Sequence, residues 1–150
     1  MNIFNIGSKS HALLLKQIVA IDLECLPKDH WTFEQWNESF TTPHYDLFYQ
    51  ISEVDLQSFA LFSYVSGNQY VDLLKIGTRF IDQRKGLAQR LLAQAFKEYS
   101  RQKVESVILE VRLHNEQAIH FYSKLGFRND MLLKSYYSDG ADGLRMWCSV

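Results

Sequence analysis

Residues 82–88, with the sequence DQRKGLA, place charged side chains and a glycine directly in front of an apolar helical pattern. The first backbone N–H groups of a helix have no partner within it, and the positive end of its dipole points outward. Such a helix start binds phosphate without a dedicated side chain. Gly86 lacks the Cβ that would block a close approach, and Arg84 and Lys85 add attraction. The segment predicts an anion site, with an ordinary loop as the alternative.

Two common phosphate-binding motifs do not fit this segment. A P-loop needs Lys and then Ser or Thr directly after its last glycine, and Leu87 follows Gly86 instead. A dinucleotide fingerprint needs the spacing GxGxxG, which is absent here. The anion site therefore has to be recognised from its position at a helix start.

The charges are unevenly distributed, although the formal net charge is only −1. Between positions 21 and 55 there are eight acidic residues and one lysine, whereas between 79 and 134 there are eleven basic and six acidic residues. The first segment suits a cationic ligand and the second a polyanion, unless both are ordinary solvated faces. The sequence pI near 6.5 argues against general nucleic-acid binding.

The composition, 47% apolar and 14% aromatic, predicts a single domain over residues 1–150. No apolar run approaches the roughly 20 residues that span a bilayer, and no signal peptide is recognisable. Cys25 and Cys148 lie outside any CxxC spacing, so neither a disulfide framework nor a structural zinc site is expected. We therefore expect a cytoplasmic protein that does not associate with membranes.

Two strands and the helix between them must position the anion site. Residues 70–78 and 104–113 are strand-like, and apolar residues recur at three- and four-residue spacing after Gly86. A strand–helix–strand unit forms a right-handed crossover, so the two strands should be parallel neighbours. The expected fold class is α/β.

The N-terminal part predicts two helices and a hairpin. Residues 10–26 form an amphipathic helix that Pro27 ends, and Thr32 with Gln35 forms a capping box that starts a short helix. Strands at 47–51 and 58–65 follow, and a turn at 66–68 leads into the strand at 70–78. The apolar stripe of the first helix consists of Leu14, Leu15, Ile18, Val19 and Leu23.

The C-terminal part predicts one helix and a closing hairpin. Asn115 can cap a helix whose end is marked by Gly126. Tyr136 and Tyr137, the turn SDGADG and residues 144–149 then form the hairpin.

Two blocks of sequence resemble the GNAT N-acetyltransferases. The spacing Gln83-x-x-Gly86-x-Ala88 resembles their pyrophosphate loop, in which Gln or Arg comes first and Gly or Ala last. Residues 109–127, LEVRLHNEQAIHFYSKLGF, are similar to a second GNAT segment and in detail to the RimI-type N-terminal acetyltransferases, which modify a ribosomal protein. HWTFEQW and KSYYSDGADGLRM resemble further parts of that group, so the resemblance covers about residues 18–146.

The resemblance implies the GNAT fold, a mixed central sheet of about six or seven strands flanked by about four helices. It also implies acetyl-CoA as the acetyl donor and coenzyme A as a product. The family binds acetyl-CoA between two parallel strands that splay apart, here 70–78 and 104–113. The residues assigned to this cofactor are Ile76, Gly77, Thr78, Gln83, Arg84, Lys85, Gly86, Leu87, Ala88 and Asn115.

The resemblance further implies attack of an amine on a thioester, without a metal or a cysteine nucleophile. A base must take a proton from the amine, and the thiolate leaves more easily when it is protonated. Glu110 of the LEVR motif is the first candidate base, acting through a water. Asp72 competes, because some relatives place a glutamate base on the earlier strand. Tyr122 is the candidate acid; the alternatives are a solvated carboxylate for Glu110 and a core aromatic for Tyr122.

The expected acceptor is a primary amine. The acidic segment 21–55 should form the wall across from the cofactor and attract an ammonium group. The RimI-type features favour the α-amine of a protein N-terminus, with Tyr136 and Tyr137 shaping a peptide groove. The alternatives are a small-molecule amine and a non-catalytic acetyl-CoA-binding module. Nucleic acid is not an expected partner, and the oligomeric state is left open between monomer and homodimer.

Overall fold

The structure, a computed structural model, describes residues 2–6, 11–53 and 55–150, with side chains from residue 11 onward. Within these residues a seven-stranded sheet has the order β1-β2-β3-β4-β5-β7-β6 and is flanked by four α-helices. This confirms the predicted mixed α/β architecture. The strands are β1 (Asn2–Ile6), β2 (Tyr45–Ser52), β3 (Asp55–Ser63), β4 (Tyr70–Thr78), β5 (Ser106–Arg112), β6 (Arg128–Leu133) and β7 (Gly143–Ser149). The helices are α1 (His11–Cys25), α2 (Phe33–Ser39), the 3₁₀ turn η1 (Phe80–Asp82), α3 (Leu87–Arg101) and α4 (Glu116–Lys124).

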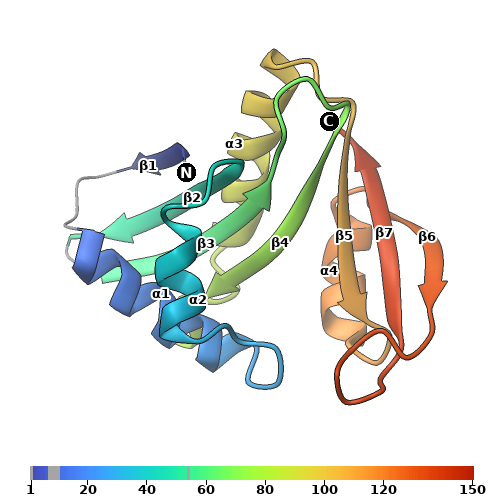
Figure 1. Cartoon of the computed structure of the whole chain (residues 1–150), viewed down its shortest axis with the longest axis horizontal. Coiled ribbons are helices and arrows are strands. Elements are labelled where there is room, and N and C mark those ends of the chain that lie inside the picture. The colour runs from blue at the N-terminus through green and yellow to red at the C-terminus, as the bar shows by residue number, and fades with distance from the viewer. Residues whose placement is uncertain (1, 7–10, 54) are drawn as a thin grey trace.

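The predicted crossover is confirmed, because β4 and β5 are parallel neighbours. Their pairing extends only from Tyr70 opposite Ser106 to Leu73 opposite Leu109. Beyond these pairs the strands run on without pairing to each other and diverge, as Figure 1 shows. The two arms of the sheet therefore separate at the carboxyl ends of β4 and β5.

A β-bulge in β4 contributes to this divergence. Leu61 of β3 pairs with Lys75 and Phe62 pairs with Leu73, so Leu74 is an extra residue without a partner in this ladder. A bulge bends its strand and increases the local twist. It therefore turns the end of β4 away from β5.

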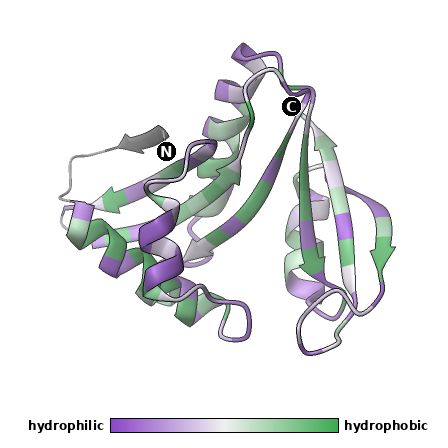
Figure 2. Cartoon of the chain, in the orientation of Figure 1, coloured by the Kyte–Doolittle hydropathy of each residue, from purple (hydrophilic) through white to green (hydrophobic). Residues whose placement is uncertain are grey.

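Helices cover both faces of the sheet. In Figure 1, α1 and α2 lie in front of it and α3 and α4 lie behind it. The front core joins Ile18 of α1 and Trp36 of α2 to Phe59 of β3, and the rear core joins Leu91 of α3 to Val107 of β5. Figure 2 shows hydrophobic residues recurring along β3, β4 and β5, and along β5 they alternate, with Val107, Leu109 and Val111 packed in the rear core. None of the helices in the described part is long and apolar enough to cross a membrane.

The capping box of Thr32 and Gln35 at the start of α2 is confirmed. The stripe predicted for α1 is partly wrong, because Leu23 is 49% exposed and Asp22 is fully buried instead. Asp22 can be buried because its carboxylate accepts hydrogen bonds from the Trp36 indole and the Trp31 backbone N–H. The predicted helix start at position 10 lies outside the described residues.

The closing hairpin is formed by different residues from those predicted. Its first arm is β6, whereas Tyr136 and Tyr137 belong to the loop that leads to β7. The sequence pattern missed β6 because this edge strand is almost fully exposed. It therefore lacks the alternation of apolar and polar residues that marks a half-buried strand. The sequence also gave no indication of β1, which pairs in parallel with β2.

Candidate active site

The divergence of β4 and β5 opens a cavity of about 980 Å³. It is lined from both arms of the sheet, by the end of β4, the start of α3, the end of β5 and the face of α4. Lys85 and Asp72 do not line it. The predicted site residues that do are Ile76, Gly77, Thr78, Gln83, Arg84, Gly86, Leu87, Ala88, Glu110, Asn115 and Tyr122.

The loop before α3 forms one end of the cavity. Arg84 has φ +62° and Gly86 has φ +73°, both in the left-handed region. The Gln83 side chain donates to the Thr78 carbonyl at 3.1 Å, which fixes this loop to the end of β4. The first N–H groups of α3 have no helical acceptor, so they can bind an anion here. The geometry fits a phosphate group that approaches the backbone at the glycine.

The Lys85 ammonium group is paired within the protein, with a carboxylate that lines the cavity. It donates to buried Asp82 at 2.8 Å, and Arg79 donates to the same carboxylate at 2.6 Å. The hydrogen bond from Lys85, followed by that from Arg79, lowers the pKa of Asp82 despite its burial. The role of Lys85 toward the cofactor stays a prediction.

Asp72 and Glu110 lie on the same face of the sheet. Asp72 is opposite Ile108 in the register, two positions before Glu110. Burial raises the pKa of Asp72, and the negative charge of Glu110 adds to the rise. Arg145, opposite Glu110 on β7, donates to it from Nε at 3.0 Å. The sequence analysis missed Arg145, because only the pairing of β5 with β7 brings it to Glu110.

Tyr122 lies on α4, 8% exposed, at the wall of the cavity. Its ring contacts those of Phe121 and Phe127, with centroid distances of 5.3 and 5.5 Å. Burial raises its pKa well above that of a free tyrosine, and Tyr137 adds a smaller rise. The Asn115 side chain accepts from the Ala118 N–H at 3.1 Å and so caps the helix that carries Tyr122. The phenol therefore stays protonated at neutral pH and can donate a proton into the cavity.

The loop between α1 and α2 forms the opposite wall, and it is fixed by a buried lysine. Lys75 of β4 pairs with Asp22 at 3.4 Å and donates to the backbone carbonyl of Asp29. Burial lowers the pKa of Lys75, and the charge of Asp22 opposes this shift. Cys25 also lines the cavity and donates to the Thr78 carbonyl at 3.2 Å. No sequence pattern singled out Lys75, because it occupies an ordinary position in a strand.

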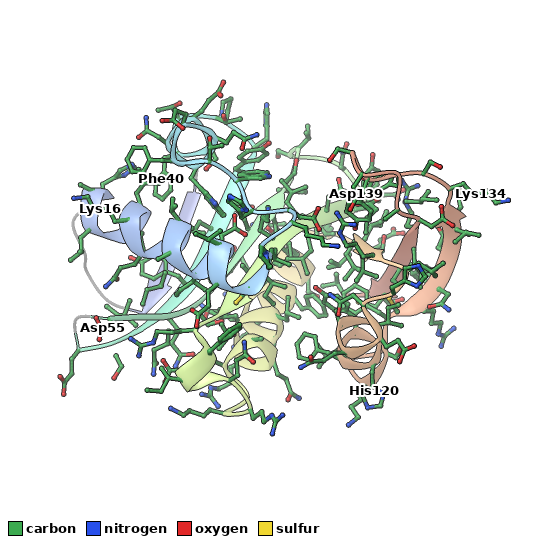
Figure 3. All side chains as sticks on the ribbon, turned by 90° about the horizontal axis from the view of Figure 1, so that it is seen from below. Lys16, Phe40, Asp55, His120, Lys134 and Asp139 are labelled. Atoms are coloured by element: carbon green, nitrogen blue, oxygen red, sulfur yellow. The ribbon has the colours of Figure 1, made fainter. Side chains whose placement is uncertain are left out.

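Arg112 joins the two arms across the mouth of the cavity. It donates to Asp29 of the α1–α2 loop from Nε at 2.6 Å and from Nη2 at 2.7 Å. It also pairs with Asp139 at 3.0 Å and lies 4.1 Å from the centroid of the Tyr137 ring. In Figure 3, Asp139 lies between the two arms, whereas His120 lies at the periphery. We call Asp29, Arg112 and Asp139 the clasp.

Part of the segment 21–55 does form a wall of the cavity, as predicted, but the prediction that carboxylates line this wall is wrong. Among the eight carboxylates counted between positions 21 and 55, Asp29 is the one that lines the cavity, and Arg112 already pairs with it. Asp22 and Asp46 are buried inside the protein, where Asp46 accepts from the Tyr99 hydroxyl at 3.0 Å. Carboxylates that neutralise internal donors cannot form a free anionic surface.

The comparisons with known proteins agree with this geometry. The N-alpha-acetyltransferase of Saccharolobus solfataricus is 42% identical over 64 residues, which are 42% of this chain and 38% of that protein. The match thus spans well under half of that relative. The crystal structure of the ribosomal-protein-S18-alanine N-acetyltransferase from Escherichia coli has a TM-score of 0.82 at 24% identity, covering 96% of this chain and 92% of that one.

A second solved structure is also similar in fold. The crystal structure of nourseothricin acetyltransferase has a TM-score of 0.65 at 26% identity, covering 71% of this chain and 66% of that one. The family model described as an acetyltransferase (GNAT) domain matches residues 14–150. Since that match covers most of the sequence, the chain belongs to the GNAT acetyltransferase family.

Proposed function

We propose that this protein transfers the acetyl group of acetyl-CoA to the α-amine of a protein N-terminus. The observation that carries the proposal is that one cavity is lined by both the Gly86 loop and the Tyr122 side chain. The loop suits a diphosphate and the phenol suits a leaving thiolate. The crystal structure of Arabidopsis thaliana NAA60 in complex with acetyl-CoA, similar in fold at 18% identity, supports the choice of ligand.

In the proposed binding mode, the N–H groups of residues 84–88 hold the diphosphate of acetyl-CoA. The pantetheine arm lies along Ile76–Thr78, where β4 has no partner on the side of β5. Asn115 orients this arm from the start of α4. The thioester then lies between the two diverging strands, beside Tyr122.

In the proposed reaction, the neutral amine attacks the thioester carbonyl carbon and a C–N bond forms. A carboxylate, Glu110 or Asp72, takes the proton of the amine through a water. The C–S bond then breaks, and the Tyr122 hydroxyl donates its proton to the leaving sulfur. The products are the acetylated amine and coenzyme A. General acid–base steps of this kind contribute about 10²- to 10⁴-fold each to a rate.

The proposal of a protein N-terminus rests on the mouth of the cavity and on the relatives. Tyr136 and Tyr137 line the cavity opposite the α1–α2 loop, as the sides of a peptide groove would. The similar proteins named above include an N-alpha-acetyltransferase and a ribosomal-protein-S18-alanine N-acetyltransferase. The similarity to nourseothricin acetyltransferase favours a small-molecule amine as the second candidate acceptor.

The cytoplasm is the compartment we propose for this activity. Both thiols, Cys25 and Cys148, are free. Burial raises the pKa of Cys148 to about 11 and also raises that of Cys25, so both stay protonated at neutral pH. Free thiols are typical of proteins from a reducing compartment.

The test is a mass-spectrometric screen with acetyl-CoA and two sets of acceptors, peptides with different first residues and small amines. We expect one acetyl group on the N-terminus of a subset of the peptides. Acetylation confined to small amines would support the second candidate, and binding of acetyl-CoA without acetylation of any amine would favour a non-catalytic module.

A further inference from the structure

A second hollow, which we call the side pocket, adjoins the active-site cavity. It measures about 420 Å³ and lies between α2 and the start of β2. Trp31 and Gln35 line both hollows, so the two adjoin at these residues. The residues lining the side pocket are Trp31, Gln35, Glu38, Ser39, Thr42 and Tyr45.

The chemistry of the side pocket suits a cation. The rings of Trp31 and Tyr45 lie 6.4 Å apart between centroids, with an angle of 35° between their planes. Glu38 is exposed, and within residues 11–53 and 55–150 its carboxylate forms no hydrogen bond or ion pair. A carboxylate beside aromatic faces attracts an ammonium or guanidinium group through charge and through the ring quadrupoles.

Three other polar side chains of the side pocket already have a partner. The Ser39 hydroxyl donates to the Trp36 carbonyl at 2.7 Å. The Thr42 hydroxyl donates to the Glu38 carbonyl at 3.0 Å. The Gln35 side chain accepts from the Thr32 N–H in the capping box. The charge of Glu38 is therefore the feature that a ligand would neutralise, and Figure 2 shows the surrounding helix α2 as largely hydrophilic.

We propose that the side pocket binds a lysine or arginine side chain of the acceptor, a few residues after the N-terminus that enters the active-site cavity. This inference rests on the proposed function, because it assumes an extended acceptor chain running from one hollow to the other across Trp31. An extended chain advances about 3.3 Å per residue, so a few residues can bridge adjoining hollows. The Lys75 ammonium, 5.3 Å from the Trp31 ring centroid, does not repel this cation strongly because Asp22 pairs with it.

The test uses eight-residue peptides that begin with alanine and carry one arginine at each position from two to six in turn. Matched peptides carry glutamine at the same position. For wild-type protein, arginine at one of these positions should raise kcat/KM by about fivefold, as expected for a single exposed charge pair. In Glu38→Gln this preference for arginine should disappear.

Glu34→Gln is the matched control, since Glu34 is an exposed glutamate on the same helix that lines neither hollow. It should keep the preference for arginine. Equal rates for arginine and glutamine peptides in wild-type protein, or an equal loss of preference in both variants, would overturn the proposal. The proposal would also be overturned if Glu38→Gln lowered the rate of spermidine acetylation but changed the rate with none of the peptides.

A binding measurement separates this inference from the proposed function. The arginine peptide with a chemically acetylated N-terminus cannot react, and its affinity for the coenzyme A-bound protein can be measured by calorimetry. Weaker binding to Glu38→Gln than to Glu34→Gln supports the side pocket even if no free amine is acetylated. Acetylation of peptides combined with equal affinities would overturn the side pocket and leave the proposed function intact.

Discussion

At the scale of single residues, Glu110 and Asp72 face the same side of the sheet but have different surroundings, and of the two only Glu110 lines the cavity. Glu110 has a guanidinium partner in Arg145 at 3.0 Å. The pKa of Asp72 is raised, first by burial and then by the charge of Glu110. Glu110 and Tyr122 could be predicted from short motifs, because each motif is local in sequence. Arg145 and Lys75 could not, because their partners come from distant segments.

The first prediction concerns the cost of keeping Asp72 charged. Its pKa is higher in the folded protein than the value of about 3.9 for a free aspartate, so the folded state holds the proton more tightly. The stability contributed by the protonated form is therefore lost as the pH rises through the folded-state pKa. We expect Asp72→Asn to melt at a higher temperature than wild type at pH 7, with a difference that vanishes toward pH 4. Thermal melts across this range provide the measurement, and a difference that grows on acidification would contradict the prediction.

The second prediction concerns Tyr122 as the acid. Tyr122→Phe should lower kcat by about 10²- to 10⁴-fold while the affinity for coenzyme A is kept, because only a proton donor is removed. The raised pKa of Tyr122 also implies that wild-type kcat shows no loss from phenol ionisation below about pH 10. Steady-state kinetics and calorimetry provide the measurements.

Tyr64→Phe is the control for this experiment. Tyr64 has the same exposed fraction as Tyr122, 8%, but lies outside the cavity. If both variants kept full activity, Tyr122 would not be the acid.

At the scale of elements, the function depends on where strand pairing stops. The periodicity of the sequence predicted β4, α3, β5 and α4, because each buries one face. The family resemblance predicted that β4 and β5 splay apart. The bulge at Leu74 and the exact end of the ladder after Leu73 could not be predicted, because both depend on cross-strand register. The loop that holds Tyr136 and Tyr137 was assigned to a strand for a similar reason, since aromatic residues favour strands locally.

The third prediction concerns the close packing of β4 against the front core. A Cβ on Gly77 would lie 2.8 Å from Phe59 Cε1 and 3.0 Å from Ile21 Cγ2. Phe59 is fully buried and its ring packs at 5.3 Å from that of Trp36, so it cannot move freely. Gly77→Ala should therefore lower the free energy of unfolding by about 1–3 kcal/mol. Urea denaturation tests this, and an unchanged midpoint would show that the core can accommodate the methyl group.

The fourth prediction concerns the clasp. In Arg112→Met the two loops that carry Asp29 and Asp139 lose their shared partner. We expect faster hydrogen–deuterium exchange in both loops, 26–31 and 134–142, and a higher KM for the acceptor with little change in coenzyme A affinity. Exchange followed by mass spectrometry, together with kinetics, tests the two parts separately.

The matched control for the clasp is Arg101→Met, which removes an exposed ion pair with Glu98 on α3, 3.3 Å long. Exposed pairs of this kind contribute about 0–1 kcal/mol. This variant should leave both loops and the acceptor KM as in wild type. Equal behaviour of the Arg112 and Arg101 variants would mean that the clasp does not hold the mouth of the cavity.

At the scale of the whole molecule, the rear core keeps the two arms together although their strands separate. Leu92 of α3, Val71 of β4, Val111 of β5 and Met146 of β7 belong to one hydrophobic cluster that spans both arms. The resemblance of two motifs, at 83–88 and at 109–127, predicted the family and the fold. The residues that line the acceptor side of the cavity could not be predicted. A count of carboxylates along the chain does not say which of them pair with other groups inside the folded protein. Asp22 and Asp46 show this directly.

The central claim is that the cavity between β4 and β5 holds acetyl-CoA with its thioester beside Tyr122. The most direct test is a crystal structure of the protein with coenzyme A. The predicted result is a diphosphate bound to the N–H groups of residues 84–88 and a sulfur atom within hydrogen-bond reach of the Tyr122 hydroxyl. A coenzyme A molecule bound outside this cavity, or one whose sulfur lies far from Tyr122, would contradict the account.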